Sequence, residues 1–374
     1  MENKKKLSRF SAASLTYFMI IIGFILIRIM SYVGLFDFMG KWGGYILNLV
    51  LQVGLMGALP LFVYSHFIKE KPKTTLENYG IKKIKITAIA ISIVIGIIVY
   101  VLNIGVATFF QLILSLLGYE RSAGGAAEAQ TILTLIANIF FVAVLPAIFE
   151  EITHRGMLVD GLSKLGIKKT ILFSALLFGL THLNVEQFFY ATLIGVLLGF
   201  MTLSTGNIIP AMIVHFMNNL LNVIVSYLLA TSKGFAQAYE GLFAKLYGGN
   251  FFVSMFVLFA IFAFLVLLLL YLVFLLFKET AVAELESLAE QEAKKQLRAE
   301  LMEEEKTIPL ASPMAMPYQI FKGGKTINVV ISSKSLRHPL KQIYHPTLKE
   351  KAFFYASFAA AIFVTVSTFI WGLL

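Results

Sequence analysis

Apolar runs long enough to cross a lipid bilayer recur along the whole chain. A spanning helix needs about 20 consecutive apolar residues, and several uninterrupted runs reach that length. The sequence is 58% hydrophobic with a mean hydropathy of +0.82, whereas a soluble protein is about half apolar. The backbone of such a run finds no water in a bilayer, so it must bond to itself as a helix. The sequence therefore predicts an all-α, polytopic membrane protein with about 8–9 membrane helices, a core helical bundle that carries the site, and a cytoplasmic charged helix and linker.

The expected membrane helices cover residues 15–36, 44–64, 86–117, 131–149, 188–203, 208–229, 251–277 and 353–374. A run at 171–180 is too short to cross a bilayer, and we interpret it as a half-buried helix that ends in a polar cavity. The 131–149 run ends at two glutamates, and Pro146 lies one turn before them. This proline either bends the helix end toward a cavity or simply ends the helix. Gly195 and Gly199 have the G-x-x-x-G spacing that indicates close helix packing.

Charge indicates how the chain lies in the membrane. The formal net charge is +10, and the basic residues cluster in loops beside apolar runs. This distribution favours cytoplasmic loops and contact with anionic lipid, and it argues against nucleic acid as a partner. The basic N-terminus and the lysine-rich loop at 69–85 place the N-terminus in the cytoplasm. The loops at 119–130 and 231–250 are expected on the exterior side.

The runs and the changes in composition divide the chain into five regions. N-terminal membrane helices occupy residues 1–127, and the helical core with the unusual polar residues occupies 128–230. An exterior loop and a membrane helix follow at 231–277. Residues 278–351 are expected to form a cytoplasmic charged helix and an irregular basic linker, and 352–374 the C-terminal membrane helix. Charge segregates on either side of Thr307, so a partner protein or anionic lipid is a weaker hypothesis for 278–351.

Polar and ionisable residues, which are costly in a bilayer, concentrate in three of these helices. They are Glu150, Glu151 and Arg155 in the first, His182 at the end of the second, and His215 and Asn219 in the third. Residues four apart share a helix face, so Glu151 can pair with Arg155, and His215 with Asn219. Intramembrane polar clusters of this kind are usually functional.

The chemistry that these side chains support is hydrolysis. A carboxylate beside a histidine can hold a water molecule and take its proton, and a second histidine with an asparagine supplies donors for the oxyanion that forms on an amide carbonyl. Two histidines with a glutamate could instead hold a divalent metal such as zinc, although the H-E-x-x-H pattern is absent. The chain has no cysteine, which excludes thiolate ligands. Spacing alone leaves a metal-held water and a metal-free site as alternatives.

Three short motifs resemble a known family in their order along the chain. They are E-E-x-x-x-R at 150–155, F-x-x-x-H at 178–182 and H-x-x-x-N at 215–219. Each motif alone is weak, but their combination in three expected membrane helices is similar to the CAAX protease and bacteriocin-processing (CPBP) family. That family contains the type II CAAX-prenyl proteases and the lysostaphin-resistance-protein-A-like proteins. The resemblance covers about residues 131–229.

The resemblance implies an intramembrane endopeptidase that acts on membrane-associated proteins or peptides, by CAAX-type or bacteriocin/signal-peptide-type processing. By motif position, Glu150 is the general base and His182 helps to hold the water. His215 and Asn219 stabilise the oxyanion, and Glu151 with Arg155 organises the site. A glutamic-type mechanism without a cofactor is favoured over a metalloprotease.

One position departs from the family pattern. The residue before the arginine is often aromatic in this family and is His154 here, and we interpret it as a harmless polar residue rather than an extra ligand. Two other functions remain as alternatives. One is an ion-coupled transporter that uses the same carboxylates and histidines as a proton relay, although no inverted repeat pairs the polar helices. The other is an inactive immunity or scaffold protein with this fold.

Overall fold

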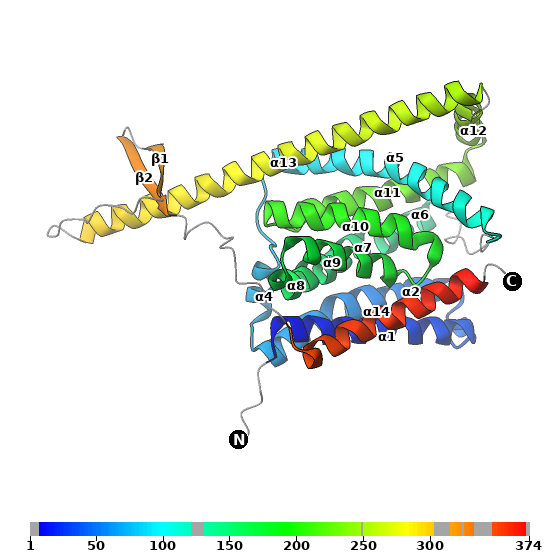
Figure 1. Cartoon of the computed structure of the whole chain (residues 1–374), viewed down its shortest axis with the longest axis horizontal. Coiled ribbons are helices and arrows are strands. Elements are labelled where there is room, and N and C mark those ends of the chain that lie inside the picture. Colours follow the sequence, from blue (N-terminus) through cyan, green and yellow to red (C-terminus); the bar gives the residue numbers. More distant parts are fainter. Residues whose placement is uncertain are drawn as a thin grey trace, which may run out of the picture.

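The computed structural model of the chain describes residues 7–120, 131–247, 250–302, 315–322, 325–332 and 346–371. Within these residues, eight helices are long and apolar enough to cross a membrane, which confirms the all-α polytopic class. Their helical segments lie roughly side by side in stacked layers (Figure 1). The exterior loop expected at 119–130 falls almost wholly outside the described residues, as do 303–314 and 333–345 of the expected linker.

The first half of the chain forms four of these candidate spans, two of which are assembled from several helical segments. The elements are α1 (Arg9–Tyr32), η1 (Asp37–Trp42), α2 (Gly43–Leu49), η2 (Val50–Ala58), α3 (Leu59–Val63), η3 (Tyr64–Ile68), α4 (Pro72–Asn78), α5 (Ile86–Leu116), α6 (Ile132–Asn138), η4 (Ile139–Val144), α7 (Leu145–Glu151), η5 (Ile152–Leu158), α8 (Val159–Leu162) and η6 (Ser163–Leu165). The segments from Gly43 to Ile68 form one span, and those from Ile132 to Leu165 form another. In both spans, α-helical turns alternate with π-helical turns.

The described part of the second half contains two short helices, a pair of strands and four further candidate spans. Its elements are α9 (Ile167–Thr181), α10 (Val185–Thr205), α11 (Ile209–Thr231), α12 (Lys233–Tyr247), α13 (Phe251–Met302), β1 (Ala315–Lys322), β2 (Lys325–Ser332) and α14 (Leu348–Trp371). The short helix predicted near 171–180 is α9, which has 15 residues. Helix α14 at the end of the chain packs alongside α1 at its beginning (Figure 1).

Three sequence expectations for this half are wrong in part. The expected loop at 231–250 is the helix α12 over most of its length. The predicted charged helix after 277 does form, but it is the continuation of the membrane helix, because α13 runs unbroken for 52 residues. The expected irregular linker contains two strands, β1 and β2, which pair antiparallel with Ala315 opposite Ser332. A basic, proline-containing composition therefore did not exclude a hairpin.

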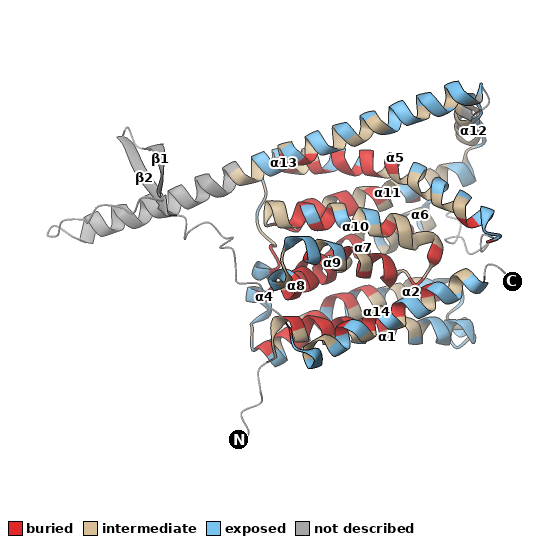
Figure 2. Cartoon of the chain, in the orientation of Figure 1, coloured by how far each residue is buried: buried red, intermediate tan, exposed pale blue. Residues whose placement is uncertain are grey.

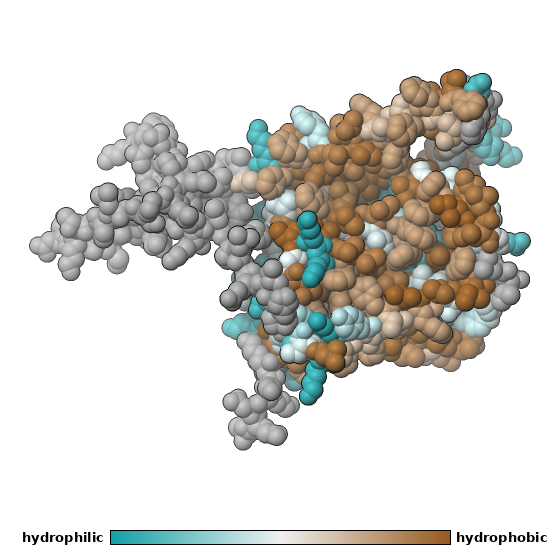
Figure 3. All heavy atoms as spheres, viewed as in Figure 1, coloured by the Kyte–Doolittle hydropathy of each residue, from teal (hydrophilic) through white to brown (hydrophobic). Residues whose placement is uncertain are grey.

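Buried and exposed residues separate as a lipid environment requires. Buried residues line the facing sides of the inner helices, and exposed ones lie mainly on the outer sides (Figure 2). Many exposed residues are large and apolar, as along α5, α13 and α14, and the visible face of the bundle is largely hydrophobic (Figure 3). Such a surface would be costly in water but is favourable against lipid tails.

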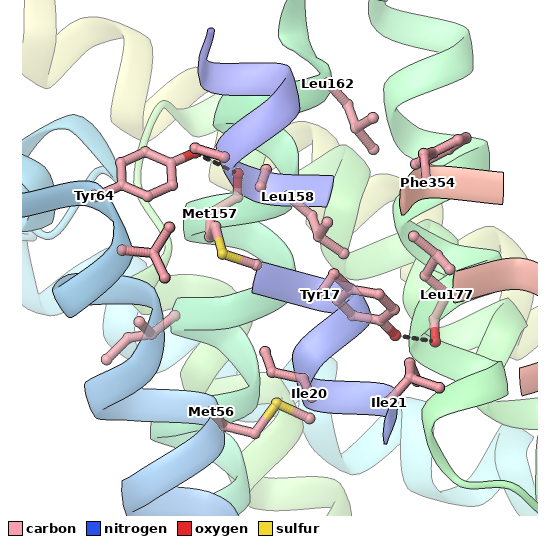
Figure 4. Packing of buried hydrophobic residues seen from close by; sticks show 14 of the residues in the cluster. Tyr17, Ile20, Ile21, Met56, Tyr64, Met157, Leu158, Leu162, Leu177 and Phe354 are labelled. Atoms are coloured by element: carbon pink, nitrogen blue, oxygen red, sulfur yellow. Dashed lines mark hydrogen bonds between the residues drawn. The ribbon is translucent and has the colours of Figure 1, made fainter. Parts of the chain in front are cut away.

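The main core cluster joins α1 to the 43–68 span, to η5 and to α9. Tyr17 and Ile20 of α1 pack here with Met56 of η2 and Met157 of η5 (Figure 4). Two of its three buried tyrosines have hydroxyl groups within hydrogen-bonding distance of backbone carbonyl oxygens: that of Tyr17 lies 2.7 Å from Leu177, and that of Tyr64 lies 3.4 Å from Met157. The core therefore fixes α1 against the two helices that carry the unusual polar residues.

Candidate active site

The two glutamates lie in the middle of a helix rather than at its end. The expected end at 149 is wrong, because the helix continues from α7 through the π-helical η5 and α8. Pro146 sits in the first turn of α7, directly after the π-helical η4. A helix that changes its winding there can accommodate the missing proline N–H group without ending. Helical turns of the π type are frequent at functional sites, and here they flank the turn that carries Glu150 and Glu151.

Glu151 is the centre of a fully buried polar cluster. Its Oε1 accepts a hydrogen bond from Arg155 Nη1 at 2.8 Å and lies 2.8 Å from His215 Nδ1. The side chains of Glu151 and Arg155 are 0% and 1% exposed. The i,i+4 pair predicted from the sequence therefore forms, and it also reaches α11. Because the carboxylate can only accept, His215 Nδ1 carries a proton, which fixes the orientation of the ring.

Glu150 has a different environment from its neighbour. Its side chain is 13% exposed, and its Oε1 accepts a hydrogen bond from Gln52 Nε2 at 2.8 Å. Its other oxygen, Oε2, lies 4.0 Å from His215 Nε2. That separation is too long for a direct hydrogen bond, but two polar groups at such a distance can share a water molecule. Glu150 and His215 thus face each other across a short gap.

The ring of Phe178, from the F-x-x-x-H motif, connects the histidines. Its centroid lies 5.4 Å from that of His182 and 5.6 Å from that of His215. The guanidinium of Arg155 lies 4.3 Å from the same centroid, a cation–π contact that stabilises the buried charge. His182 is half-buried at the end of α9. The second motif therefore packs directly against the first and the third.

Asn219 forms hydrogen bonds with residues other than its motif partner His215. Its Nδ2 donates to the carbonyl oxygen of Val142 at 3.1 Å, and its Oδ1 accepts from Asn218 at 3.1 Å. Val142 lies in η4, two turns before Glu150 on the same long helix. The structure thus joins Glu150, Glu151, Arg155 and His215 by direct polar contacts or close approach. It joins His182 to them through Phe178, and Asn219 through the backbone of the glutamate helix.

His154 contacts two of the three motifs through its ring nitrogens. It is fully buried, with Nδ1 at 2.8 Å from the carbonyl oxygen of Glu150 and Nε2 at 3.1 Å from Thr181 Oγ1. It also contacts Phe178 edge to face, with ring centroids 5.0 Å apart. We expected His154 to be a harmless polar residue. In the structure it contacts residues of the first and second motifs, so that interpretation was incomplete.

Gln52 and Tyr17 were missed by the sequence reasoning. Gln52 is a buried polar residue in the apolar run at 44–64, and its polarity inside a membrane helix was a usable signal. Tyr17 gave no such signal, because a tyrosine in a membrane helix is common near the bilayer surface. Its position beside His154 depends on how α1 packs.

The histidines and glutamates of the three motifs do not form a recognisable metal site in the described part of the chain. Within the part of the chain that the structure describes, no three His, Asp or Glu side chains come together in a way that could hold a metal ion. Of the three candidate ligands, His215 already bonds Glu151 with Nδ1, and the rings of His182 and His215 each contact the ring of Phe178. These residues do not fit the three-ligand geometry of a catalytic zinc site.

Comparison with known proteins connects this geometry to one family. The family model described as type II CAAX prenyl endopeptidase Rce1-like matches residues 132–221. This segment is therefore similar to Rce1-like domains. The match contains all three motifs and is consistent with the CPBP resemblance. No curated protein and no solved structure matches the chain.

The Rce1-like match supports a broad functional class. It supports assignment to CAAX-type intramembrane endopeptidases, which act on membrane-associated substrates in a lipid bilayer. The eight apolar helices agree with an integral, multi-pass membrane protein. The domain spans α6 through most of α11, so α1, the 43–68 span, α13 and α14 lie outside the match.

Proposed function

We propose that the protein is an intramembrane endopeptidase in which Glu150 activates a water molecule for attack on a peptide carbonyl. The observation that carries this proposal is the arrangement around Glu150. Gln52 holds one carboxylate oxygen, and the other faces His215 Nε2 at 4.0 Å. A water in this gap can give its proton to Glu150 while its oxygen attacks the carbonyl carbon. His182, whose ring also contacts Phe178, helps to hold this water in the proposal.

The second half of the reaction uses the same groups. Attack converts the carbonyl oxygen into an oxyanion, and the proton on Glu150 then passes to the leaving amine nitrogen as the C–N bond breaks. One amide hydrogen of Asn219 is donated to the carbonyl oxygen of Val142, and the second can be donated to the oxyanion. His215 donates from Nε2 only when it carries a proton on both nitrogens, and its Nδ1 proton is directed at the Glu151 carboxylate.

Glu151 and Arg155 organise this site rather than react. Both are fully buried, so neither can approach a substrate without leaving the other unpaired. Their role in the proposal is to fix the ring of His215, as a buried carboxylate does for a catalytic histidine. The reaction needs no cofactor in this scheme, and a metal-assisted reaction is the alternative that metal removal tests.

The orientation of the chain follows from its charges and contacts. Arg9 bonds Glu70 at 2.6 Å and Asp160 at 2.5 Å, so the start of α1, the lysine-rich loop and the end of the glutamate helix lie on one side. We propose that this is the cytoplasmic side, because basic residues concentrate there. A partner or anionic lipid for residues 278–351 remains a hypothesis.

A cleavage assay tests the proposed function. Purified protein in proteoliposomes is incubated with a library of membrane-associated peptides, with and without a prenyl group, and Glu150→Gln is the matched control. We expect cleavage by the wild-type protein that Glu150→Gln lacks, and the prenylated and plain members of the library identify the substrate class. Equal cleavage by both proteins contradicts the role of Glu150. Substrate-dependent proton flux without cleavage would indicate the transporter, and a folded protein with neither activity would indicate the inactive scaffold.

A further inference from the structure

Helix α1 lies outside the Rce1-like segment but bonds to both neighbours of His182. The hydroxyl group of Tyr17 lies within hydrogen-bonding distance of the Thr181 hydroxyl and 2.7 Å from the carbonyl oxygen of Leu177 (Figure 4), so its one proton can be donated to either. Arg28 Nη1 donates to the carbonyl oxygen of Leu183 at 2.7 Å. Thr181 and Leu183 are the residues immediately before and after His182. One helix therefore fixes the turn that carries this histidine on both sides.

The backbone of this turn is strained, which is a reason for it to be fixed. Leu183 has a φ of 49°, in the left-handed region that residues other than glycine rarely adopt. Such a conformation persists only when the surroundings determine it. The side chain of Leu183 is buried and its N–H group bonds to Leu180, while its carbonyl meets the Arg28 guanidinium.

Arg28 also needs an explanation of its own. A charged residue within a membrane helix is costly, and it usually pairs with another charge or with backbone carbonyls. Arg28 lies four residues before the end of α1, where the residue is exposed overall but its Nη1 is directed at the carbonyl oxygen of Leu183. The guanidinium could equally be hydrated by snorkelling to the membrane surface. Its bond to the Leu183 carbonyl therefore indicates a role in holding the turn that carries His182.

His154 extends the network to the proposed base. The carbonyl oxygen of Glu150 can only accept, so Nδ1 of His154 carries the proton of the 2.8 Å contact. In the neutral ring, Nε2 then accepts from the Thr181 hydroxyl at 3.1 Å. When Tyr17 donates to Thr181 rather than to Leu177, a continuous series of hydrogen bonds runs from Tyr17 through Thr181 and His154 to the backbone of Glu150. It connects the turn of the base to the turn of His182.

We propose that Tyr17 and Arg28 are positioning residues that hold His182 in register with Glu150, and that His154 is the link between the two turns. This inference rests on the proposed function, because it gives His182 and Glu150 a common task. Neither Tyr17 nor Arg28 touches the reacting groups, so both act through the Thr181–His182–Leu183 turn. A misplacement of a reacting group by about 1 Å can cost on the order of 100-fold in rate.

The test compares Tyr17→Phe and Arg28→Gln with two controls in the full chain. Arg28→Lys keeps a charged donor, and Tyr45→Phe removes a tyrosine hydroxyl whose bond is to Asn138 instead, at 2.7 Å. The measurements are kcat and KM for a peptide that the wild type cleaves, thermal stability, and hydrogen–deuterium exchange of the amides at 182–185. Tyr17→Phe and Arg28→Gln are expected to lower kcat about 10- to 100-fold with KM little changed. Exchange at 182–185 should become faster in both.

The controls separate positioning from general stability. Arg28→Lys should restore most of the lost kcat, and Tyr45→Phe should leave both kcat and the exchange at 182–185 at their wild-type values. A lower thermal stability with unchanged kcat in Tyr17→Phe and Arg28→Gln would overturn the proposal and leave these residues a merely structural role. Unchanged exchange at 182–185 in both would also overturn it. If the wild-type protein cleaves no peptide, the proposed function fails on its own, and the exchange measurement still decides whether α1 fixes the turn.

Discussion

Substitution by glutamine should have different effects at the two adjacent glutamates, on stability at one and on activity at the other. Glu151→Gln keeps the shape of the side chain but removes the negative charge that faces Arg155 and His215, each at 2.8 Å. Glu150→Gln makes the same chemical change one residue earlier, at a side chain that is 13% exposed and that bonds Gln52. We expect the first substitution to destabilise the fold and the second to abolish the reaction.

The size of the stability effect follows from burial. Breaking a buried ion pair by removing one partner costs roughly 3–5 kcal/mol, because the other charge is left uncompensated. Arg155 keeps its cation–π contact with Phe178 at 4.3 Å and a contact of Nη2 with the Gly195 carbonyl at 3.4 Å, so we expect about 3 kcal/mol for Glu151→Gln. Glu150→Gln retains an oxygen that can accept from Gln52, so its cost should be about 1 kcal/mol or less. Its rate should fall by about 10²- to 10⁴-fold, the usual contribution of a general base.

The assay measures both quantities on the same preparations. Unfolding by SDS titration in mixed micelles gives the free energy of unfolding, and single-turnover cleavage gives the rate of the folded fraction. Glu151→Asp is a useful third variant, since it keeps the charge but shortens the reach to Arg155 and His215. Equal destabilisation by Glu150→Gln and Glu151→Gln, or a fully stable Glu151→Gln, would refute the division of roles between the two residues.

Three further predictions follow from individual contacts. Gly195→Ala should destabilise the protein by about 1–3 kcal/mol, because a Cβ there would lie 3.0 Å from the Cα of Ala175. Gly199→Ala should be tolerated, because the nearest atom to its Cβ would lie 3.7 Å away. Equal shifts of the two variants in thermal unfolding would contradict this prediction. Gln52→Leu should lower the cleavage rate about tenfold by removing the donor to Glu150. Asn48→Leu removes an amide whose oxygen is buried on the same span and should not lower the rate; equal rates for both variants would count against Gln52. Since the chain has no cysteine, Lys73→Cys should react with a membrane-impermeant maleimide only from the cytoplasmic side, and labelling from the exterior would reverse the proposed orientation.

Local rules predicted much of this arrangement from the sequence. The length of the apolar runs indicated the membrane helices, and the spacing of Glu151 and Arg155 predicted their ion pair. The order of the three motifs selected the residues that the structure then groups around Phe178. These predictions depend on helix periodicity and on the cost of charge in lipid, which are properties of short segments.

Tertiary packing determined what the sequence did not reveal. Polar residues at 150–155 resembled the end of a membrane helix, but they are paired inside the bundle, so the helix continues through η5. The bond from Arg28 to Leu183 joins residues 155 positions apart, a pairing that no local pattern encodes. The hairpin of β1 and β2 had a signal that was overlooked, since Gly323 and Gly324 lie between two runs rich in β-branched and aromatic residues.

Cleavage in H₂¹⁸O by metal-free protein tests the central claim most directly. The protein is stripped with a chelator, its metal content is checked by elemental analysis, and a single turnover is analysed by mass spectrometry of the peptide products and of the fragment that contains Glu150. If Glu150 activates a water without a metal, the new carboxyl terminus gains one ¹⁸O atom, the Glu150 side chain gains none, and Glu150→Gln gives no product. Loss of cleavage on metal removal with recovery on metal addition, ¹⁸O in the Glu150 carboxylate, or undiminished cleavage by Glu150→Gln would contradict the account.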